Sequence, residues 1–451
     1  MSWSWTEAAI GRDAAKALPK GWGQIRVADI SQIVNGAPYD SKHFGDLGEP
    51  LLRIRDLVAQ QVETRYDGPE LTGYRVTGDS LLVGMDGDFN VGRWALGEPA
   101  LLNQRVLAIE TDPLWSKWIE YCLPPALKVI NDLTYATTVK HLSSVDVSKI
   151  RIPNPPEELL QPIADYLDHE TAEIDAAISD QIALIELLEE RQRIQKYQLV
   201  TGQTLAMPRA AEVVRFWAEL PLDWSLQKLQ WHFDIGNGST PSTSTARFWD
   251  QDGFPWLNSS VVNEPSVVHP SRRVSQTALE ELHLPIVPPG SLLMGITGQG
   301  KTRGMVTPLD IEATINQHLA YLTPRSPQGP ISVEYLRLAL DVAYPELRQL
   351  SDGNGGTKGA LTCHMLQQFR VPVPPKNLQA ALVTEARRET AATAQAVADA
   401  ESFIALARER RAALITAAVT GQIDVTARHK PAAEQLEDDI AQGLHLSLIH
   451  I

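Results

Sequence analysis

One glycine-rich stretch matches the sequence motif of a nucleotide-binding loop. Gly295–Thr302 reads GITGQGKT, which fits the pattern G-x-x-x-x-G-K-[ST], and it follows an apolar run that predicts a strand. Such a loop must open a helix whose first turn holds phosphate, yet Gly304 and Pro308 follow at once. The sequence therefore favours a turn between strands, in which Lys301 and Arg303 are exposed and could contact phosphate or guanine. A nucleotide-hydrolysing enzyme stays as a third hypothesis.

A second stretch has the letters of a catalytic motif. Asn154–Glu157 reads NPPE, whereas DNA amino-methyltransferases carry Asn-Pro-Pro followed by an aromatic residue that stacks on the target base. Neighbouring prolines are more simply the boundary signal of a following helix. The histidines are scattered without metal-ligand spacing, and the sequence has no carboxylate–carboxylate–lysine cluster typical of a nuclease. No catalytic residue and no metal site are predicted, so the chain is expected to bind rather than to react.

Polar side chains that could read base edges gather in the loops of both halves. Arg and Lys suit guanine, and Asn and Gln suit adenine, through paired donors and acceptors. In the first half the DNA-binding candidates are Lys42, His43, Arg53, Arg55, Asp86, Asp88, Asn90, Arg93, Thr138 and Lys140. In the second half they are Asn237, Ser239, Thr240, Arg247, Asn258, Gln299, Lys301, Arg303, Lys358 and His364. For any single one the competing interpretation is a solvated loop residue.

Two long stretches repeat one another and must position these loops. Arg151–Gln203 and Arg370–Gln422 align without a gap at an offset of 219, open with Arg-[Ile/Val]-Pro-x-Pro-Pro and close with Val-Thr-Gly-Gln. Each predicts a helix of roughly 40 residues, about 60 Å long, which is typical of a coiled coil. Gly202 and Gly421 suit the left-handed cap that ends a helix. Apolar residues at a 3.5-residue period predict the seam between the two helices. The seam positions are Leu167, Ile174, Ile178, Ile185, Leu188, Val383, Val397, Ile404 and Leu414.

The charges of the two repeats also favour pairing with each other. The first carries a net charge of −7 and the second +2. Unequal helices of opposite sign prefer each other to copies of themselves. The alternative is two separate amphipathic helices that pack on local cores, which leaves the gapless repeat without a reason.

The segments that precede the two helices match as well. Leu18–Trp22 (LPKGW) corresponds to Leu220–Trp224 (LPLDW), and Asn103-Gln104 corresponds to Asn316-Gln317. Short apolar runs between Gly, Asp, Asn and Pro clusters, such as 80–83, 106–109 and 291–294, predict strands joined by loops. Helices are expected at 115–123 and 333–340, so each segment is expected to be a mixed α and β domain. A shared scaffold role for Asn-Gln is as consistent as base contact, since units that read different sequences should differ where they read. The predicted organisation is a leader 1–17, a first unit 18–150, a helix 151–203, a linker 204–219, a second unit 220–369, a helix 370–422 and a tail 423–451.

Composition sets limits on the class of protein. The 451 residues carry a net charge of −15, which is unusual for a chain that grips DNA alone, so a partner would supply much of the phosphate contact. Two cysteines without metal spacing, no signal peptide and no long apolar run predict a cytoplasmic protein.

Together these features resemble the specificity subunit of Type I restriction-modification systems. The resemblance covers about 18–425. It rests on the repeated proline openings, the Val-Thr-Gly-Gln closings, and Gly236–Pro241 (GNGSTP) with Phe254–Trp256 (FPW) in the second unit. The first unit departs from the pattern, because Asn35–Pro38 (NGAP) replaces the fuller glycine motif.

The resemblance implies a fold and a set of partners. The fold would be α+β, with two mixed α/β target-recognition domains separated by an antiparallel coiled coil in a pseudo-twofold internal repeat. Each domain would read one half of a split, asymmetric DNA site. Two modification (methyltransferase) subunits would bind S-adenosylmethionine and methylate adenine, and restriction subunits would cut, so this chain itself would bind no cofactor. The alternative is a coiled-coil scaffold that does not read DNA.

Overall fold

A computed structural model describes residues 18–59, 62–69, 75–76, 78–94, 98–133, 141–209, 216–217, 219–298, 300–352 and 359–425. The chain divides into two units. Unit 1 comprises Met1–Gln181 with Ser402–Ile451, and unit 2 comprises Ile182–Glu401. The predicted leader and most of the predicted tail lie outside the described residues.

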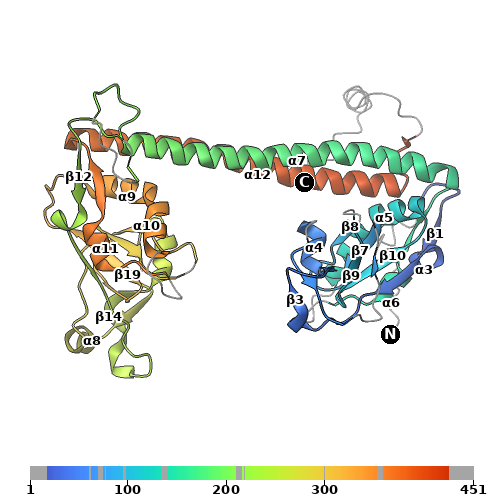
Figure 1. The fold of residues 1–451 in the computed structure, drawn as a ribbon, viewed down its shortest axis with the longest axis horizontal. Helices are drawn as coiled ribbons and strands as arrows, with labels where there is room; N and C mark the ends of the chain where they lie inside the picture. The colour runs from blue at the N-terminus through green and yellow to red at the C-terminus, as the bar shows by residue number, and fades with distance from the viewer. Residues whose placement is uncertain are drawn as a thin grey trace. The chain divides into compact units, whose positions relative to one another are not determined.

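Unit 1 is built on an antiparallel sheet of strand order β2-β10-β7-β8 (Figure 1). Its strands are β2 (Gln32–Asn35), β7 (Ser80–Gly84), β8 (Val91–Trp94) and β10 (Val106–Glu110). Both faces of this sheet are covered: Leu81 and Val83 pack with Trp118 of α5 (Pro113–Leu133), whereas Leu82 faces a second apolar cluster. The predicted strands at 80–83 and 106–109 and the predicted helix at 115–123 are confirmed.

A second sheet of unit 1 has the order β3-β5-β4-β9-β6. The strands are β3 (Phe44–Gly45), β4 (Glu49–Leu52), β5 (Arg65–Tyr66), β6 (Arg75–Val76) and β9 (Ala100–Leu102). β4 and β9 run parallel, with Leu51 opposite Leu101 and Leu52 opposite Leu102. This parallel pair places the turn after β9 next to the end of β4.

Unit 2 repeats this arrangement with other side chains. Its antiparallel sheet has the order β13-β19-β16-β17, and a smaller sheet has the order β15-β14-β18, in which β14 and β18 are parallel. The strands are β13 (Phe233–Asn237), β14 (Trp249–Leu257), β15 (Arg272–Val274), β16 (Ser291–Gly295), β17 (Val306–Leu309), β18 (Thr314–Ile315) and β19 (Leu319–Pro324). α9 (Val333–Val342) takes the place of α5, at the predicted helix 333–340. The shorter helices of the two units are α3 (Val27–Ile30), α4 (Ile54–Ala59), α6 (Ser144–Lys149), α8 (Gln276–Glu281), α10 (Tyr344–Asp352) and α11 (Cys363–Gln368).

The repeated proline motif begins with a strand, not with the helix. β11 (Arg151–Asn154) pairs with β1 (Gly23–Arg26), and β20 (Arg370–Val373) pairs in the same antiparallel register with β12 (Ser225–Lys228). The predicted helix of roughly 40 residues lies between the last proline and the closing glycine, as α7 and α12 do. The strand that Arg-[Ile/Val]-Pro forms before it was not predicted.

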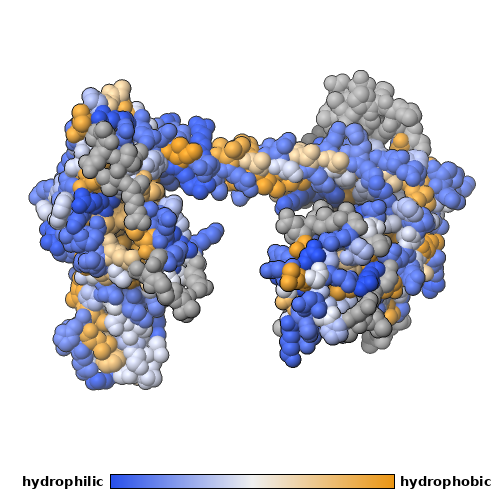
Figure 2. Space-filling view, in the orientation of Figure 1, coloured by the Kyte–Doolittle hydropathy of each residue, from blue (hydrophilic) through white to orange (hydrophobic). Residues whose placement is uncertain are grey.

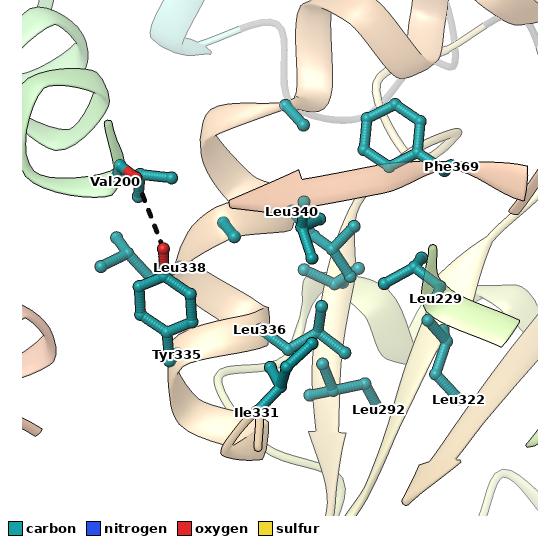
Figure 3. Packing of buried hydrophobic residues seen from close by; sticks show 14 of the residues in the cluster. Val200, Leu229, Leu292, Leu322, Ile331, Tyr335, Leu336, Leu338, Leu340 and Phe369 are labelled. Carbon is teal, nitrogen blue, oxygen red and sulfur yellow. Dashed lines mark hydrogen bonds between the residues drawn. The ribbon is translucent and has the colours of Figure 1, made fainter. Parts of the chain in front are cut away.

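One buried aromatic side chain in each unit ties this strand to the core. The Trp118 Nε1–H donates to the carbonyl of Pro153 at 2.8 Å, and the Tyr335 hydroxyl donates to the carbonyl of Pro372 at 3.1 Å. Burial raises the pKa of Tyr335, so the phenol keeps its hydrogen. Figure 3 shows Tyr335 reaching from α9 toward the carbonyl of Val200, 3.4 Å away.

The two long helices are α7 (Glu157–Val200) and α12 (Lys376–Val419), each of 44 residues. In unit 1 the first part of α7 lies beside the last part of α12, and Leu167 and Ile415 share one core. In unit 2 the last part of α7 joins the first part of α12, where Leu199 and Val383 share another. The helices therefore run antiparallel. The predicted fold class, with two mixed units and an antiparallel helix pair, is confirmed.

The nine predicted seam residues share one property. Each is buried or half-buried, whereas Ile182, Leu184 and Leu187 of the same helix are exposed. Apolar surface accordingly recurs among the charged side chains of the long helices (Figure 2). The assignment of each residue to the seam stays a prediction.

The ends of both helices contact the openings of the units. Gly202 and Gly421 have φ of +65° and +71°, the left-handed cap that the sequence predicted. A Cβ on Gly202 would lie 2.7 Å from Cγ of Pro221, and one on Gly421 would lie 2.4 Å from Cγ of Pro19. Val-Thr-Gly-Gln therefore ends α7 against the opening of unit 2 and ends α12 against the opening of unit 1.

Candidate nucleic-acid interface

Unit 1 presents three polar side chains at the end of its antiparallel sheet. Asp86 follows β7, Arg105 precedes β10, and His141 pairs with Asp86 in an isolated β-bridge. His141 Nδ1 lies 2.7 Å from Asp86 Oδ1, and Arg105 Nη1 lies 3.4 Å from Asp86 Oδ2. The side chains of Arg105 and His141 are about half exposed, and that of Asp86 is less so. The group therefore presents cationic and imidazole donors to solvent around a shielded carboxylate.

Unit 2 carries a different polar group at the equivalent place. Thr297 follows β16, His318 precedes β19, and Thr297 forms an isolated bridge with Ala360. Thr297 Oγ1 lies 2.7 Å from His318 Nδ1, and Gln317 Nε2 lies 3.3 Å from His318 Nε2. The hydroxyl of Thr240 donates to Gln317 Oε1 at 2.6 Å. These exposed groups form a hydrogen-bonded row without a guanidinium.

The backbone around the two groups is bonded in the same way. Met85 N–H donates to the Arg105 carbonyl at 2.9 Å, and Ile296 N–H donates to that of His318 at 3.0 Å. Likewise Asn103 N–H donates to Leu52, and Asn316 N–H donates to the Leu257 carbonyl, both at the end of a parallel strand. These equivalent backbone hydrogen bonds form the same frame in both units.

The asparagine of each shared Asn-Gln pair belongs to this frame. Asn103 Oδ1 accepts from Arg105 N–H at 3.3 Å, and Asn316 Oδ1 accepts from His318 N–H at 3.0 Å. Each asparagine therefore closes a turn on the residue two positions later, which is its common role in loops. Of the two interpretations left open, the structure favours a scaffold role for the asparagines.

A glycine allows a second loop to approach each turn. A Cβ on Gly36 would lie 2.2 Å from the Asn103 carbonyl oxygen, and one on Gly238 would lie 1.7 Å from that of Ile315. Backbone and side chain cannot occupy that space together, so both positions need glycine. The glycine motif of unit 2 and its shorter counterpart in unit 1 therefore serve the same close contact.

Some predicted DNA-binding residues of unit 1 lie on its second sheet. Lys42 is exposed, His43 Nδ1 lies 3.3 Å from Asp67, and the guanidinium of Arg53 lies 5.6 Å from the centre of the Phe44 ring. These three cationic or titratable groups are brought together around one short strand. Their contact with DNA stays a prediction.

Two other arginines of unit 1 are engaged within the protein. Arg55 lies 3.2 Å from Glu63, and Arg93, which is three-quarters buried, lies 2.6 Å from Glu120. Arg93 also donates to the Asp79 carbonyl, so its geometry is that of a structural contact. Asp88 is exposed and Asn90 is half-buried.

The candidates of unit 2 divide between exposed and structural positions. Asn237 and Ser239 are exposed beside Thr240 in the glycine loop. Arg247 is paired with Glu281 at 2.8 Å, while Asn258 Oδ1 accepts from Ser260 N–H and caps a turn. His364 is exposed on α11. Four further candidates lie outside the described residues: Thr138, Lys140, Gln299 and Lys358.

The expectation that Arg303 is exposed is wrong. Its side chain is almost fully buried and bonds to Asp352, and a Cβ on Gly359 would overlap its guanidinium. Lys301 is exposed as expected. The loop they share leads into β17 and not into a helix, so the nucleotide-binding spelling has no phosphate-holding helix behind it. Arg303 therefore folds inward and holds this loop through Asp352.

Two properties of the described residues bear on partners and metals. None of the helices among 18–425 that the structure describes is long and apolar enough to cross a membrane. Within the same residues, no three His, Cys, Asp or Glu side chains gather as a metal ion would require.

Comparison with known proteins identifies the architecture. Residues 221–384 match the family model described as Type I restriction modification DNA specificity domain. Residues 221–384 are thus similar to a Type I DNA specificity domain. The resemblance stated from the motifs is confirmed, since the curated relatives are specificity subunits too.

The relatives match only part of this chain. The specificity subunit of the Type I restriction enzyme EcoBI from Escherichia coli is 34% identical over 218 residues, 46% of each chain. That of MjaIX from Methanocaldococcus jannaschii is 27% identical over 170 residues, 37% of this chain and 38% of the relative. The chain therefore spans about half or less of the length of these relatives.

A solved structure extends the likeness in fold. It comes from work on assembly and conformational transition of the type I R-M system, and it covers 90% of this chain and 99% of its own with a TM-score of 0.61. At 18% identity it shows the fold alone. The specificity domain and its counterpart in unit 1 thus share an architecture with a known chain.

The prediction missed Arg105, His141, Thr297 and His318 as members of these groups, and it left open whether Gln317 has a scaffold role or contacts a base. A signal for two of them was present in the sequence. Arg105 and His318 are the first residues after the matched Asn-Gln pairs, at the point where the copies stop agreeing. His141 comes to Asp86 across 55 positions, and no local pattern predicts that contact.

Proposed function

We propose that this chain is the DNA-recognition subunit of a Type I restriction-modification complex. Each unit reads one half of a split site, and the two halves differ in sequence. The observation that carries the proposal is the doubled backbone frame with unlike polar side chains, Arg105, Asp86 and His141 in one copy and Thr297, Gln317 and His318 in the other. A fixed frame with variable polar groups suits readers of two base sequences.

The chain itself performs no catalysis in this proposal. Two modification subunits bind S-adenosylmethionine and methylate adenine, restriction subunits cut, and the complex acts in the cytoplasm. The net charge of −15 supports the need for partners, because a chain of this sign attracts phosphate weakly. The exposed apolar side chains of α7 and α12, Ile182, Leu184, Leu187, Phe403 and Leu406, are consistent with surfaces that a partner covers.

Reconstitution tests the proposal directly. The purified chain is combined with a Type I modification subunit and S-adenosylmethionine, and a random DNA library is methylated and sequenced. We expect one asymmetric motif of two defined halves separated by a fixed gap. Assembly without sequence-dependent binding or methylation would instead support the scaffold hypothesis.

A second experiment tests the helices as the spacer. One turn of four residues is inserted in or deleted from α7 within 175–191, with a matching change in α12. Four residues span about 6 Å, or roughly two base pairs of B-DNA. We expect the gap to change by about that amount while both half-sites keep their sequence. An altered half-site with an unchanged gap contradicts the spacer role.

A further inference from the structure

The exposed group of unit 1 contains an arginine whose orientation is set by a neighbouring acid. Arg105 makes its side-chain contacts through Nη1, which lies 3.4 Å from Oδ2 and 3.5 Å from Oδ1 of Asp86 and 3.5 Å from His141 Nδ1. Among the described residues its Nε and Nη2 have no partner. The side chain is 51% exposed, so one edge of the planar guanidinium is held and the opposite edge points two N–H groups at solvent.

Asp86 is itself fixed from the other side. A carboxylate only accepts hydrogen bonds, so the 2.7 Å contact requires that His141 Nδ1 carries the hydrogen. The isolated bridge between the two backbones holds this pair together, and the Asp86 side chain is only 25% exposed. The acid is therefore occupied as an orienting group and is a poor acceptor for a base amino group.

The free edge of Arg105 selects one base. In the major groove guanine presents two acceptors side by side, O6 and N7, whereas adenine replaces one of them with an amino donor that repels a guanidinium. We propose that Arg105 reads a guanine in the half-site of unit 1, with Asp86 as its positioning residue. This inference rests on the proposed function and names the base at that site.

The counterpart in unit 2 explains why the two halves would differ here. His318 stands where Arg105 stands, Thr297 replaces Asp86, and Ala360 replaces His141 in the bridge. An imidazole hydrogen-bonded to a hydroxyl offers no paired donors. The half-site of unit 2 therefore has no requirement for guanine at the equivalent position.

The main competing role for Arg105 is a contact with a DNA phosphate. Loss of a phosphate contact weakens binding almost equally for every sequence, whereas loss of a base contact relaxes one position. Base preference, measured position by position, separates the two roles.

The experiment uses the complex of the full chain with its modification subunit. Wild type, Arg105→Ala, Arg105→Lys and Asp86→Asn each methylate a library in which the unit 1 half-site is randomised. Arg26→Ala is the matched control, because it removes another exposed arginine that is paired with an aspartate. Thermal unfolding of each variant confirms that the fold is retained.

The expected result is a change at one base pair. Arg105→Ala lowers the preference for guanine at a single position by roughly five- to a hundredfold, since a paired base contact discriminates by that order. Arg105→Lys retains part of this preference. Asp86→Asn weakens it at the same position and nowhere else. The unit 2 half-site is unchanged in all variants, and Arg26→Ala alters neither half.

Three outcomes overturn the inference while leaving the proposed function intact: a wild-type half-site without a guanine, an unchanged preference in Arg105→Ala, or an equal loss over all sequences. A wild-type complex that methylates without any split motif overturns the proposed function itself.

Discussion

Units 1 and 2 share one backbone arrangement but carry different polar side chains on it. In both, a turn closed by an asparagine follows a short parallel strand, and a glycine lets a neighbouring loop touch that turn. The side chains displayed on the frame are an ion pair with histidine in unit 1 and a row of hydroxyl, amide and imidazole groups in unit 2. A duplicated chain can therefore change what it recognises while the groups that hold its fold stay in place.

In the interior, by contrast, the two units differ in residue type but keep the same hydrogen bond. Trp118 and Tyr335 are different residues, but each is fully buried and donates to the carbonyl of the first proline in the repeated motif. The bond satisfies a buried carbonyl in both units, and a buried carbonyl left without a donor would be costly. The interior thus preserves a hydrogen bond across a change of residue, whereas the exposed turn does not preserve its chemistry.

The largest expected effect comes from removing these aromatic side chains. Trp118→Ala should lower the local stability of unit 1 by about 3–5 kcal/mol, because it leaves a cavity and an unsatisfied carbonyl at Pro153. Native-state hydrogen exchange of the full chain should show faster exchange in β1 and β11. The matched variant Tyr335→Ala should do the same in β12 and β20. If either variant raised hydrogen exchange equally in both units, the view that each aromatic side chain stabilises only its own unit would be wrong.

A smaller effect separates the loops that differ most between the units. The loop between β16 and β17 runs over 296–305, whereas its counterpart between β7 and β8 runs only over 85–90. Arg303→Ala should destabilise unit 2 by roughly 1.5–3 kcal/mol, since it removes a buried side chain and its charged hydrogen bond to the exposed Asp352. Lys301→Ala, two positions away and exposed, should change the free energy of unfolding by less than about 0.5 kcal/mol.

Urea denaturation of both variants checks this prediction. The two substitutions remove one positive charge each from the same loop, so a general charge effect would make them alike. Equal destabilisation by Lys301→Ala and Arg303→Ala would contradict the internal role of Arg303. A DNA-binding defect in Lys301→Ala without loss of stability would show that the exposed Lys301 and the buried Arg303 have different roles.

The features that could be predicted from the sequence were those carried by its internal repeat and by the spacing of its apolar residues. The offset of 219 and the 3.5-residue period predicted the paired helices, and the positive-φ glycines after Val-Thr were predicted from their place at a helix end. The strand inside Arg-[Ile/Val]-Pro was missed, because its partners β1 and β12 lie more than a hundred positions away and carry no local signal.

Side-chain direction was the other limit of the sequence. Arg303 and Lys301 are both cations in a glycine-rich loop, and only the packing of Gly359 and Asp352 decides that one of them is buried. Arg105 was missed for another reason. It directly follows a matched Asn-Gln pair but differs from its counterpart His318, so the comparison of the two copies stopped before it. In a duplicated reader, the place where the copies cease to agree is where recognition should be sought.

The smallest expected effect concerns how each unit joins its two helix segments. In unit 1 the guanidinium of Arg411 on α12 lies 2.9 Å from Asp175 of α7, and both side chains are more than a third exposed. Apolar groups also join the helices in both units: Leu167 and Ile415 share the core of unit 1, and Leu199 and Val383 share that of unit 2. Arg411→Ala should therefore cost unit 1 only about 0.2–1 kcal/mol.

Salt sharpens this last comparison, because it screens an exposed ion pair and leaves apolar contacts in place. A double-mutant cycle of Arg411→Ala with Asp175→Asn, measured by hydrogen exchange at low and high ionic strength, should show a coupling energy that falls with salt. The matched cycle of Leu199→Ala with Val383→Ala in unit 2 should be insensitive to salt. A coupling of Arg411 to Asp175 that stayed constant in high salt would mean that packing of the arginine stem, and not its charge, joins the helices in unit 1.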